Sequence, residues 1–160
     1  MVLHDDWLYE RNGYVCGVRV AGVLIKNNQI LVQRDRNGNE YALPGGHIKI
    51  GETLEDGLRR EFQEEIDMAI TVKRLLWSEE SFWNQNGTKV HHLCFYYLAE
   101  APLYFDIPRS GEFISHKDND DVVIGWLNTE KIEKITIYPS FLKTELRNLC
   151  SPIKHFVTYD

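Results

Sequence analysis

The stretch from Gly45 to Met68 limits what this chain can fold into more than any other part of it. A pair of glycines predicts a turn, and apolar side chains then recur at helical spacing, so we expect an amphipathic helix from about Thr53 to Ile66. Thr53 is suited to cap this helix, because Asp56 follows three residues later in a capping-box arrangement. The apolar stripe consists of Leu54, Leu58 and Phe62. One layer of the fold is therefore a helix with a single apolar face.

Three acids in the second half of this helix are placed against ordinary helix design. Glu61, Glu64 and Glu65 stand at i, i+3 and i+4, so they share one face and repel one another by roughly 0.2–0.5 kcal/mol per pair. They also approach the helix C-terminus, where the helix dipole disfavours negative charge. Arg59 and Arg60 relieve part of this repulsion. A bound divalent cation would relieve more of it, because hard cations prefer clustered carboxylate oxygens, whereas the alternative is a solvated acidic face.

The order of residues in this stretch resembles the signature of the Nudix hydrolase family. Gly46 is followed at the family's spacing by Glu52, then by Arg60-Glu61 and by Glu64-Glu65. Asp67 stands where the family normally has glycine, Phe62 is bulkier than the usual aliphatic residue, and Gly57 replaces a common alanine. The resemblance implies an α/β fold, a Nudix-type α/β/α sandwich with a mixed β-sheet.

The remaining sequence agrees with a layered α/β domain. We expect one domain over residues 1–160, with a helix near the end of the chain from Pro139 to about Cys150 and a long loop over residues 101–121. Asn128 is expected to cap a short helix that begins at Thr129. Runs rich in β-branched and aromatic residues predict strands at Cys16–Lys26, Ile30–Arg34, Ala69–Trp77, Lys89–Glu100 and Val122–Leu127.

Composition excludes several classes of function. The net charge of −6 argues against binding to a nucleic acid polymer, which requires a basic surface. No apolar run is long enough to span a bilayer, and the first residues lack a signal-peptide pattern, so no membrane association is expected. Three widely spaced cysteines indicate free thiols, and we expect a cytoplasmic protein.

The resemblance also implies roles for the residues of the acidic helix. Glu61 and Glu65 are expected to bind Mg²⁺ or Mn²⁺, and Glu64 is expected to be either a further metal ligand or the general base. Gly45 could contribute its backbone carbonyl to the metal, and Glu52 would join the outer metal shell. Arg60 is expected to pair with a neighbouring glutamate and to hold its rotamer. These catalytic and metal-binding assignments leave open which glutamate takes the proton of the attacking water.

Candidate substrate-binding residues lie outside the helix. Arg34, at a strand end, could contact a phosphate, or it could be solvated. One of Trp77, Phe82 and Trp83 could stack on a nucleobase, although packing in the core or at its rim is the commoner fate of aromatic residues. His91 and His92 alternate faces, so only one of them can point at a site.

The long loop offers a further acid. Nudix enzymes often bring an additional acidic residue from such a loop, and Glu112 and Asp118 are the preferred candidates here. The alternative for each is a solvated loop charge. His47, which follows the glycine turn, is expected to be structural.

The resemblance implies a metal-dependent hydrolase that cleaves the pyrophosphate bond of a nucleoside diphosphate linked to another moiety. Nucleotide sugars, ADP-ribose and modified nucleoside triphosphates all remain open as the small-molecule substrate. Two alternatives are a Nudix-like module that senses a nucleotide without hydrolysing it and an acidic scaffold for a protein partner. A homodimer is also open, because many members of the family are dimers.

Overall fold

The computed structural model describes residues 5–103 and 121–160, together with the backbone of residues 112–114. The α-helices are α1 (Leu54–Ile66) and α2 (Leu142–Glu145), and the 3₁₀ helix η1 covers Thr129–Lys134. The strands are β1 (Leu8–Arg11), β2 (Tyr14–Lys26), β3 (Gln29–Asp35), β4 (Glu40–Ala42), β5 (Gly45–His47), β6 (Thr71–Gln85), β7 (Thr88–Glu100), β8 (Glu112–Ile114), β9 (Val122–Asn128), β10 (Thr136–Tyr138) and β11 (Lys154–Tyr159).

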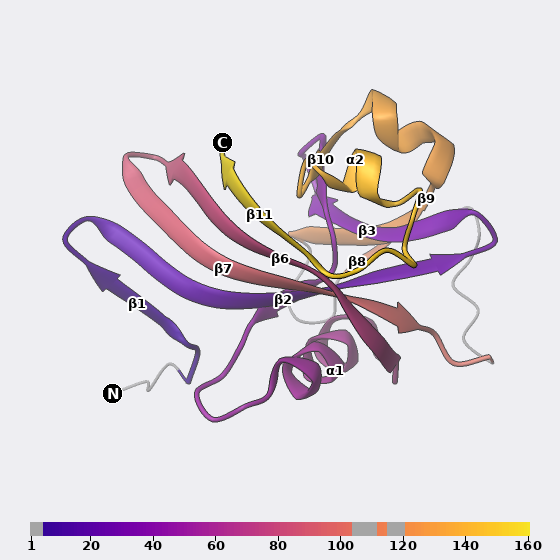
Figure 1. Cartoon of the computed structure of the whole chain (residues 1–160), viewed down its shortest axis with the longest axis horizontal. Helices are drawn as coiled ribbons and strands as arrows, with labels where there is room; N and C mark the ends of the chain where they lie inside the picture. Colours follow the sequence, from indigo (N-terminus) through magenta and orange to yellow (C-terminus); the bar gives the residue numbers. More distant parts are fainter. Residues whose placement is uncertain (1–4, 104–111, 115–120) are drawn as a thin grey trace.

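The strands form one mixed sheet with the central order β10-β4-β3-β2-β7-β6-β11. The pairs β2/β7, β6/β11 and β4/β10 are parallel, whereas β2/β3 and β6/β7 are antiparallel. Strand β2 is the axis of the sheet, because it also pairs with β1 and β5. In Figure 1, β1, β2, β6 and β7 extend together beyond the helices as a curved arm.

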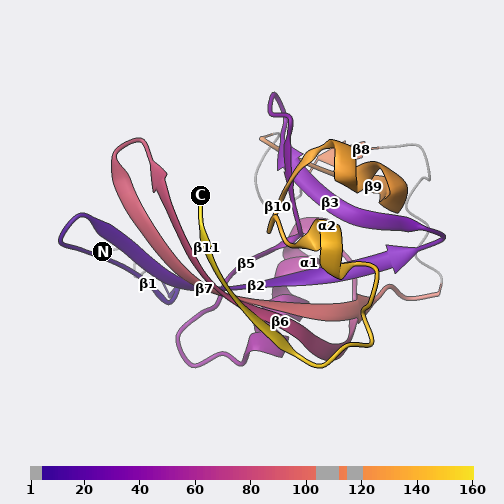
Figure 2. The same ribbon diagram turned by 45° about the horizontal axis from the view of Figure 1, so that its top comes forward.

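Helices lie on both sides of this sheet, as Figures 1 and 2 show. On one side, Leu58, Phe62 and Ile66 of α1 belong to a buried cluster with Val20 and Leu24 of β2. The opposite face has a second cluster that includes residues of η1 and α2, notably Ile132 and Leu142. The expected α/β/α sandwich with a mixed sheet is confirmed. None of the described helices reaches the length and apolar character that crossing a bilayer requires.

The central helix begins and ends as its sequence predicts. The Thr53 side chain accepts a hydrogen bond from the backbone N–H of Asp56 at 3.1 Å, which satisfies one of the free donors at the helix N-terminus. Asp67 follows the last turn in the left-handed region, with φ 54° and ψ 40°. Glycine adopts this conformation without steric cost, which explains why the signature that this sequence resembles has glycine where this chain has Asp67. Asn128 likewise caps η1.

Three expectations about the chain after α1 differ from the structure. The strand expected at Ala69–Trp77 runs from Thr71 to Gln85, because polar residues after Trp77 find partners across the β6/β7 and β6/β11 pairs. The helix expected from Pro139 to Cys150 is the short α2, and the chain then forms β11 beside β6. Within the expected loop 101–121, Glu112–Ile114 form strand β8 against β9.

Candidate functional site

The turn expected at the glycine pair is wrong, because Gly45 and Gly46 pair with β2 as part of strand β5, and this strand and the acidic helix meet at a carboxylate. Gly45 and Gly46 lie in β5, which pairs with Ala21 and Val20 of β2. A Cβ placed on Gly46 would lie only 2.4–2.6 Å from the carboxylate atoms of Glu61, and one on Gly45 would lie 2.0 Å from the Val20 carbonyl oxygen. A Cβ at Gly45 would clash with the β2 backbone, and a Cβ at Gly46 would displace the Glu61 carboxylate. Gly46 therefore lets the backbone approach the Glu61 carboxylate directly, and Gly45 lets β5 pack closely against β2.

Arg60 connects three carboxylates of this site. Its Nε and Nη2 atoms donate to the two carboxylate oxygens of Glu52 at 2.7 and 3.0 Å. Its Nη1 atom donates to Glu61 Oε1 at 2.7 Å and to Glu64 Oε2 at 3.2 Å. Nη2 also donates to the His47 carbonyl at 3.0 Å, which ties the helix to β5. The expectation that Arg60 pairs with neighbouring glutamates is confirmed.

The bidentate Arg60–Glu52 pair shifts the pKa values of both partners. The hydrogen bond from Arg60 is the main cause that lowers the pKa of Glu52 below its ordinary value of 4.5, and the N–H of Lys49 adds to it at 2.9 Å. The same bond raises the pKa of Arg60 above its ordinary value. Glu52 is thus ionised and held by protein donors, a position from which it orients Arg60.

The other two glutamates differ in exposure. The Glu65 side chain is buried, with 4% of the residue exposed, and Glu61 is buried to 2%, whereas the Glu64 side chain is 38% exposed. Buried carboxylates in proteins are paired or bind metals. Over residues 5–103 and 121–160, no three His, Cys, Asp or Glu side chains already converge as a metal site. The side chains at this site nevertheless fit a hard divalent cation, because carboxylate oxygens predominate among the atoms that could bind it. The guanidinium cation of Arg60, which lies against Glu61 and Glu64, shows that positive charge is accommodated there.

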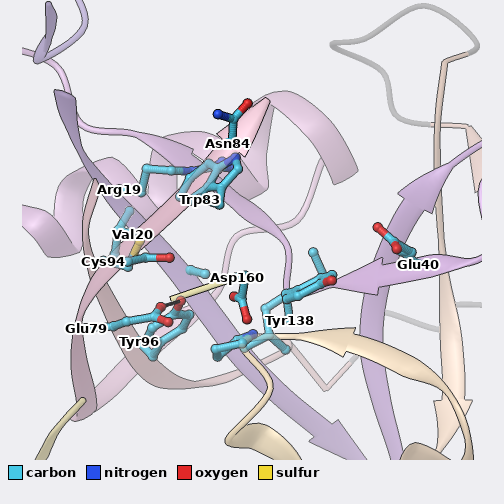
Figure 3. A pocket seen from close by; sticks show the side chains of 15 residues that line it. Arg19, Val20, Glu40, Glu79, Trp83, Asn84, Cys94, Tyr96, Tyr138 and Asp160 are labelled. Carbon is cyan, nitrogen blue, oxygen red and sulfur yellow. Dashed lines mark hydrogen bonds between the residues drawn. The ribbon is translucent and has the colours of Figure 1, made fainter. Parts of the chain in front are cut away.

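A cavity of about 410 Å³ lies on the sheet face opposite α1, and its described lining residues do not include the glutamates of α1. Arg19 of β2, Glu79 and Trp83 of β6, and Tyr138 at the end of β10 line it, as Figure 3 shows. Arg19 lines the cavity and pairs with His47, which follows Gly46 in β5, so strands β2 and β5 connect the cavity wall with the glutamate site. Arg19 and Glu79 are not among the site residues expected from the sequence.

Both missed residues carry a signal in the sequence. Arg19 is a single cation within the apolar strand CGVRVAGV, and a charged residue inside such a strand requires a special environment. Glu79 lay beyond the expected end of β6, so the alternation that places it on the cavity face was not applied to it.

The three aromatic candidates have different surroundings. Trp77 is 1% exposed and packs between the rings of Tyr96 and Phe141, at centroid distances of 6.2 and 5.7 Å. The proposal that Trp77 stacks on a base is therefore wrong, because neither face of its ring is accessible.

Phe82 stacks between His91 and Tyr159, at centroid distances of 4.1 and 5.1 Å, and does not line the cavity. Its candidacy for stacking on a base is also corrected, because both ring faces are covered. Trp83 lines the cavity, with His92 against its edge. It is the aromatic candidate that the structure places where a ligand could reach.

Arg34 organises a loop and does not line the cavity. Its Nη1 atom donates to the carbonyls of Asp35, Arg36 and Gly38 at 3.1, 2.8 and 3.4 Å. These bonds hold the turn after β3, and the expected contact of Arg34 with a substrate phosphate stays a prediction.

The two loop acids are placed only in part. Glu112 begins β8, but its side chain lies outside the described residues, and so does all of Asp118. His91 and His92 lie on opposite faces of β7, as predicted, with His92 against His47 at a centroid distance of 5.1 Å.

Comparison with known proteins identifies the family. Residues 17–144 match the NUDIX domain. An ADP-ribose pyrophosphatase of Methanocaldococcus jannaschii is 40% identical over 62 residues, which are 37% of this chain and 37% of that protein. An 8-oxo-dGTP diphosphatase of Haemophilus influenzae is 33% identical over 89 residues, which are 52% of this chain and 63% of that protein. The chain thus spans 37% and 63% of the lengths of these relatives.

The fold is similar to that of solved Nudix structures. A NUDIX hydrolase from Nitrosomonas europaea superposes with a TM-score of 0.62 at 15% identity, covering 90% of this chain and 79% of that one. At this identity the likeness concerns the fold alone. The domain match covers most of the chain, and Gly46, Arg60 and Glu61, which carry the resemblance in the sequence, lie together in the fold. The chain belongs to the Nudix family.

Proposed function

We propose that this protein hydrolyses the phosphoric anhydride of a nucleotide with the help of Mg²⁺ or Mn²⁺. The observation that carries the proposal is the Glu61 carboxylate, buried to 2%, held by Arg60 and placed directly against Gly46. Both named relatives, an ADP-ribose pyrophosphatase and an 8-oxo-dGTP diphosphatase, act on nucleotides, which supports this class of substrate.

The anhydride is slow to hydrolyse because its negative oxygens repel a nucleophile. Glu61 and Glu65 are the residues that would hold the cation, with Glu64 and the Gly45 carbonyl as further donors. A cation bound there supplies charge screening for the phosphates and acidifies water. Arg60 fixes the rotamers of Glu52 and Glu61 through hydrogen bonds of 2.7–3.0 Å, so these carboxylates are pre-organised.

Glu64 is suited to proton transfer. Its side chain is 38% exposed, whereas Glu61 and Glu65 are buried, so water reaches Glu64 most easily. A general base must lie within hydrogen-bonding reach of the water that it deprotonates. We assign this role to Glu64 or to another glutamate of α1, and Arg60 donates to Glu64 at 3.2 Å.

The cavity provides the place for the nucleotide. Arg19 offers a cation for the phosphate end, and Trp83 offers an aromatic surface for the base. The substrate remains one of a nucleotide sugar, ADP-ribose or a modified nucleoside triphosphate.

Product formation from nucleoside triphosphates, nucleotide sugars and ADP-ribose, with and without Mg²⁺, tests this proposal. Glu64→Gln and Glu65→Gln should each lower kcat/KM by at least about 100-fold while the protein remains folded. Glu55→Gln is the matched control, because Glu55 lies in the first turn of the same helix and pairs with exposed Arg59. It should retain full activity.

Unchanged turnover in Glu64→Gln and Glu65→Gln would refute the assignment of the site. If the native protein binds nucleotides but hydrolyses none of them, it is a nucleotide-binding module of Nudix fold.

A further inference from the structure

The floor of the cavity is a row of three side chains on adjacent strands. Arg19 of β2 is opposite Cys94 of β7, and Cys94 is opposite Glu79 of β6. All three line the cavity, and Figure 3 shows Cys94 between the other two. Neighbouring strands lie about 4.8 Å apart, so the positions of Arg19 and Glu79 are separated by roughly 10 Å.

The two ends of this row carry opposite charge, and its middle is neutral. Burial raises the pKa of Cys94 to about 11, so the thiol stays protonated at neutral pH. Within the described ranges, no hydrogen bond or ion pair joins the half-buried Arg19 guanidinium to another residue. Arg19 lies at the end of the row beside β5. An anionic group of a ligand is therefore expected at that end.

Glu79 forms the other end and is an acceptor held in a fixed position. The residue is 4% exposed, and its carboxylate accepts hydrogen bonds from the Tyr96 hydroxyl at 2.5 Å and from the Thr158 hydroxyl at 2.6 Å. A carboxylate has about four acceptor positions, so two remain. No cation pairs with Glu79 in the part of the chain that the structure describes. Donors from a ligand would therefore satisfy a buried charge.

We propose that Glu79 reads the edge of the nucleobase and selects bases that present two adjacent N–H donors, as guanine does. This inference rests on the proposed nucleotide substrate. Guanine offers an N1–H and an exocyclic N2 amino group side by side, and these match the two oxygens of a carboxylate. Adenine offers an amino group beside the N1 acceptor, and that acceptor would face another acceptor.

The rest of the cavity fits a nucleotide placed in this way. Successive side chains of a strand point to opposite faces, so Glu79, Ser81 and Trp83 lie on the same face of β6. With the base at Glu79, the phosphates point toward Arg19, beside which Figure 3 shows the Trp83 ring. The cation at Arg19 and the carboxylate at Glu79 thus determine the orientation of the nucleotide in the cavity.

The test uses mononucleotides, whose binding requires no turnover. Calorimetry with GMP, IMP and AMP on the native protein should give the order GMP, IMP, AMP from tightest to weakest, because IMP lacks the amino group at C2. We expect GMP to bind at least about tenfold more tightly than AMP, as one bidentate contact to a base provides.

Glu79→Gln should reduce the GMP-to-AMP ratio at least about fivefold, because an amide offers one acceptor and adds a donor. Glu80→Gln is the matched control, because it makes the same chemical change on the opposite face of β6, and it should leave the ratio unchanged. The ligand series on the native protein remains decisive if Glu79→Gln does not fold.

Equal binding of GMP and AMP, or tighter binding of AMP, by the native protein would overturn the inference. So would an unchanged ratio in a folded Glu79→Gln variant. A GMP preference without hydrolysis of any nucleotide supports the inference and refutes the proposed activity. Hydrolysis without a base preference would support the proposed activity and refute the inference.

Discussion

His92 provides a pH-dependent contribution to stability that can be calculated from its surroundings. The residue is 4% exposed, with its ring against His47 and Trp83, and neither ring nitrogen has a hydrogen-bond partner among the described residues. Burial, followed by the charges of Arg19, His47 and His91, lowers its pKa from 6.5 to about 3. The folded protein therefore keeps this ring neutral at pH values where the unfolded chain protonates it.

The sign and size of the effect follow from this difference. The contribution is fully present above pH 6.5 and is lost as the pH falls from 6.5 toward 3, because the unfolded state then binds the additional proton. The slope is about 1.4 kcal/mol per pH unit in that interval. Between about pH 7.5 and about pH 5.5, the free energy of unfolding should fall by about 1.4 kcal/mol through His92 alone. This corresponds to about 3–6 °C in Tm.

Urea unfolding at these two pH values, on the native protein and on His92→Phe, isolates this contribution. Phenylalanine fills a similar volume without titrating, so the variant should lose about 1.4 kcal/mol less than the native protein over the interval. His155→Asn is the control, because His155 is exposed on β11, and it should follow the native protein. A loss in His92→Phe equal to the native loss would refute the reasoning.

Three further substitutions test the packing around α1. Gly46→Ala should lower both Mg²⁺ affinity in calorimetry and kcat/KM by at least about tenfold, because its Cβ would lie 2.4–2.6 Å from the Glu61 carboxylate atoms; normal values would contradict the proposed site. Asp67→Gly should raise the free energy of unfolding, measured in urea, by about 0.5–1 kcal/mol, because Asp67 has φ 54°. A loss of stability would show that the hydrogen bond that Gln63 donates to the Asp67 side chain contributes more than the backbone strain. Gly22→Ala should lower the free energy of unfolding by about 1–3 kcal/mol in the same assay, because its Cβ would lie 2.8 Å from the Phe62 ring. Adding Phe62→Leu should recover most of that loss, and no recovery would show that the clash is relieved elsewhere.

The acidic helix could be predicted because its determinants are local. The cap at Thr53, the apolar stripe and the partners of Arg60 are all separated by short distances in the sequence. The bulk of Phe62 could not be explained in this way. It is accommodated by Gly22 on β2, which leaves the space that the ring occupies, and this pairing is visible only once the strand is placed against the helix.

The cavity side of the site was harder to predict because its residues depend on pairing across strands. Glu79 was assigned to no element, since polar residues after Trp77 end the apolar run that defines a strand in the sequence. In the fold these residues continue β6, and Thr158 of β11 meets Glu79 from the last strand. The predictions of one domain over residues 1–160, a cytoplasmic location and a homodimer stay predictions.

Arg60 gives the folded chain a counter-ion of its own. Because its guanidinium already neutralises part of the charge on Glu52, Glu61 and Glu64, the helix can dock on β5 before any metal arrives. The bidentate bond to Glu52 anchors Arg60 beside the carboxylates that would hold the metal. Chelation should therefore abolish turnover while the chain stays folded, because the carboxylates keep a counter-ion supplied by the protein.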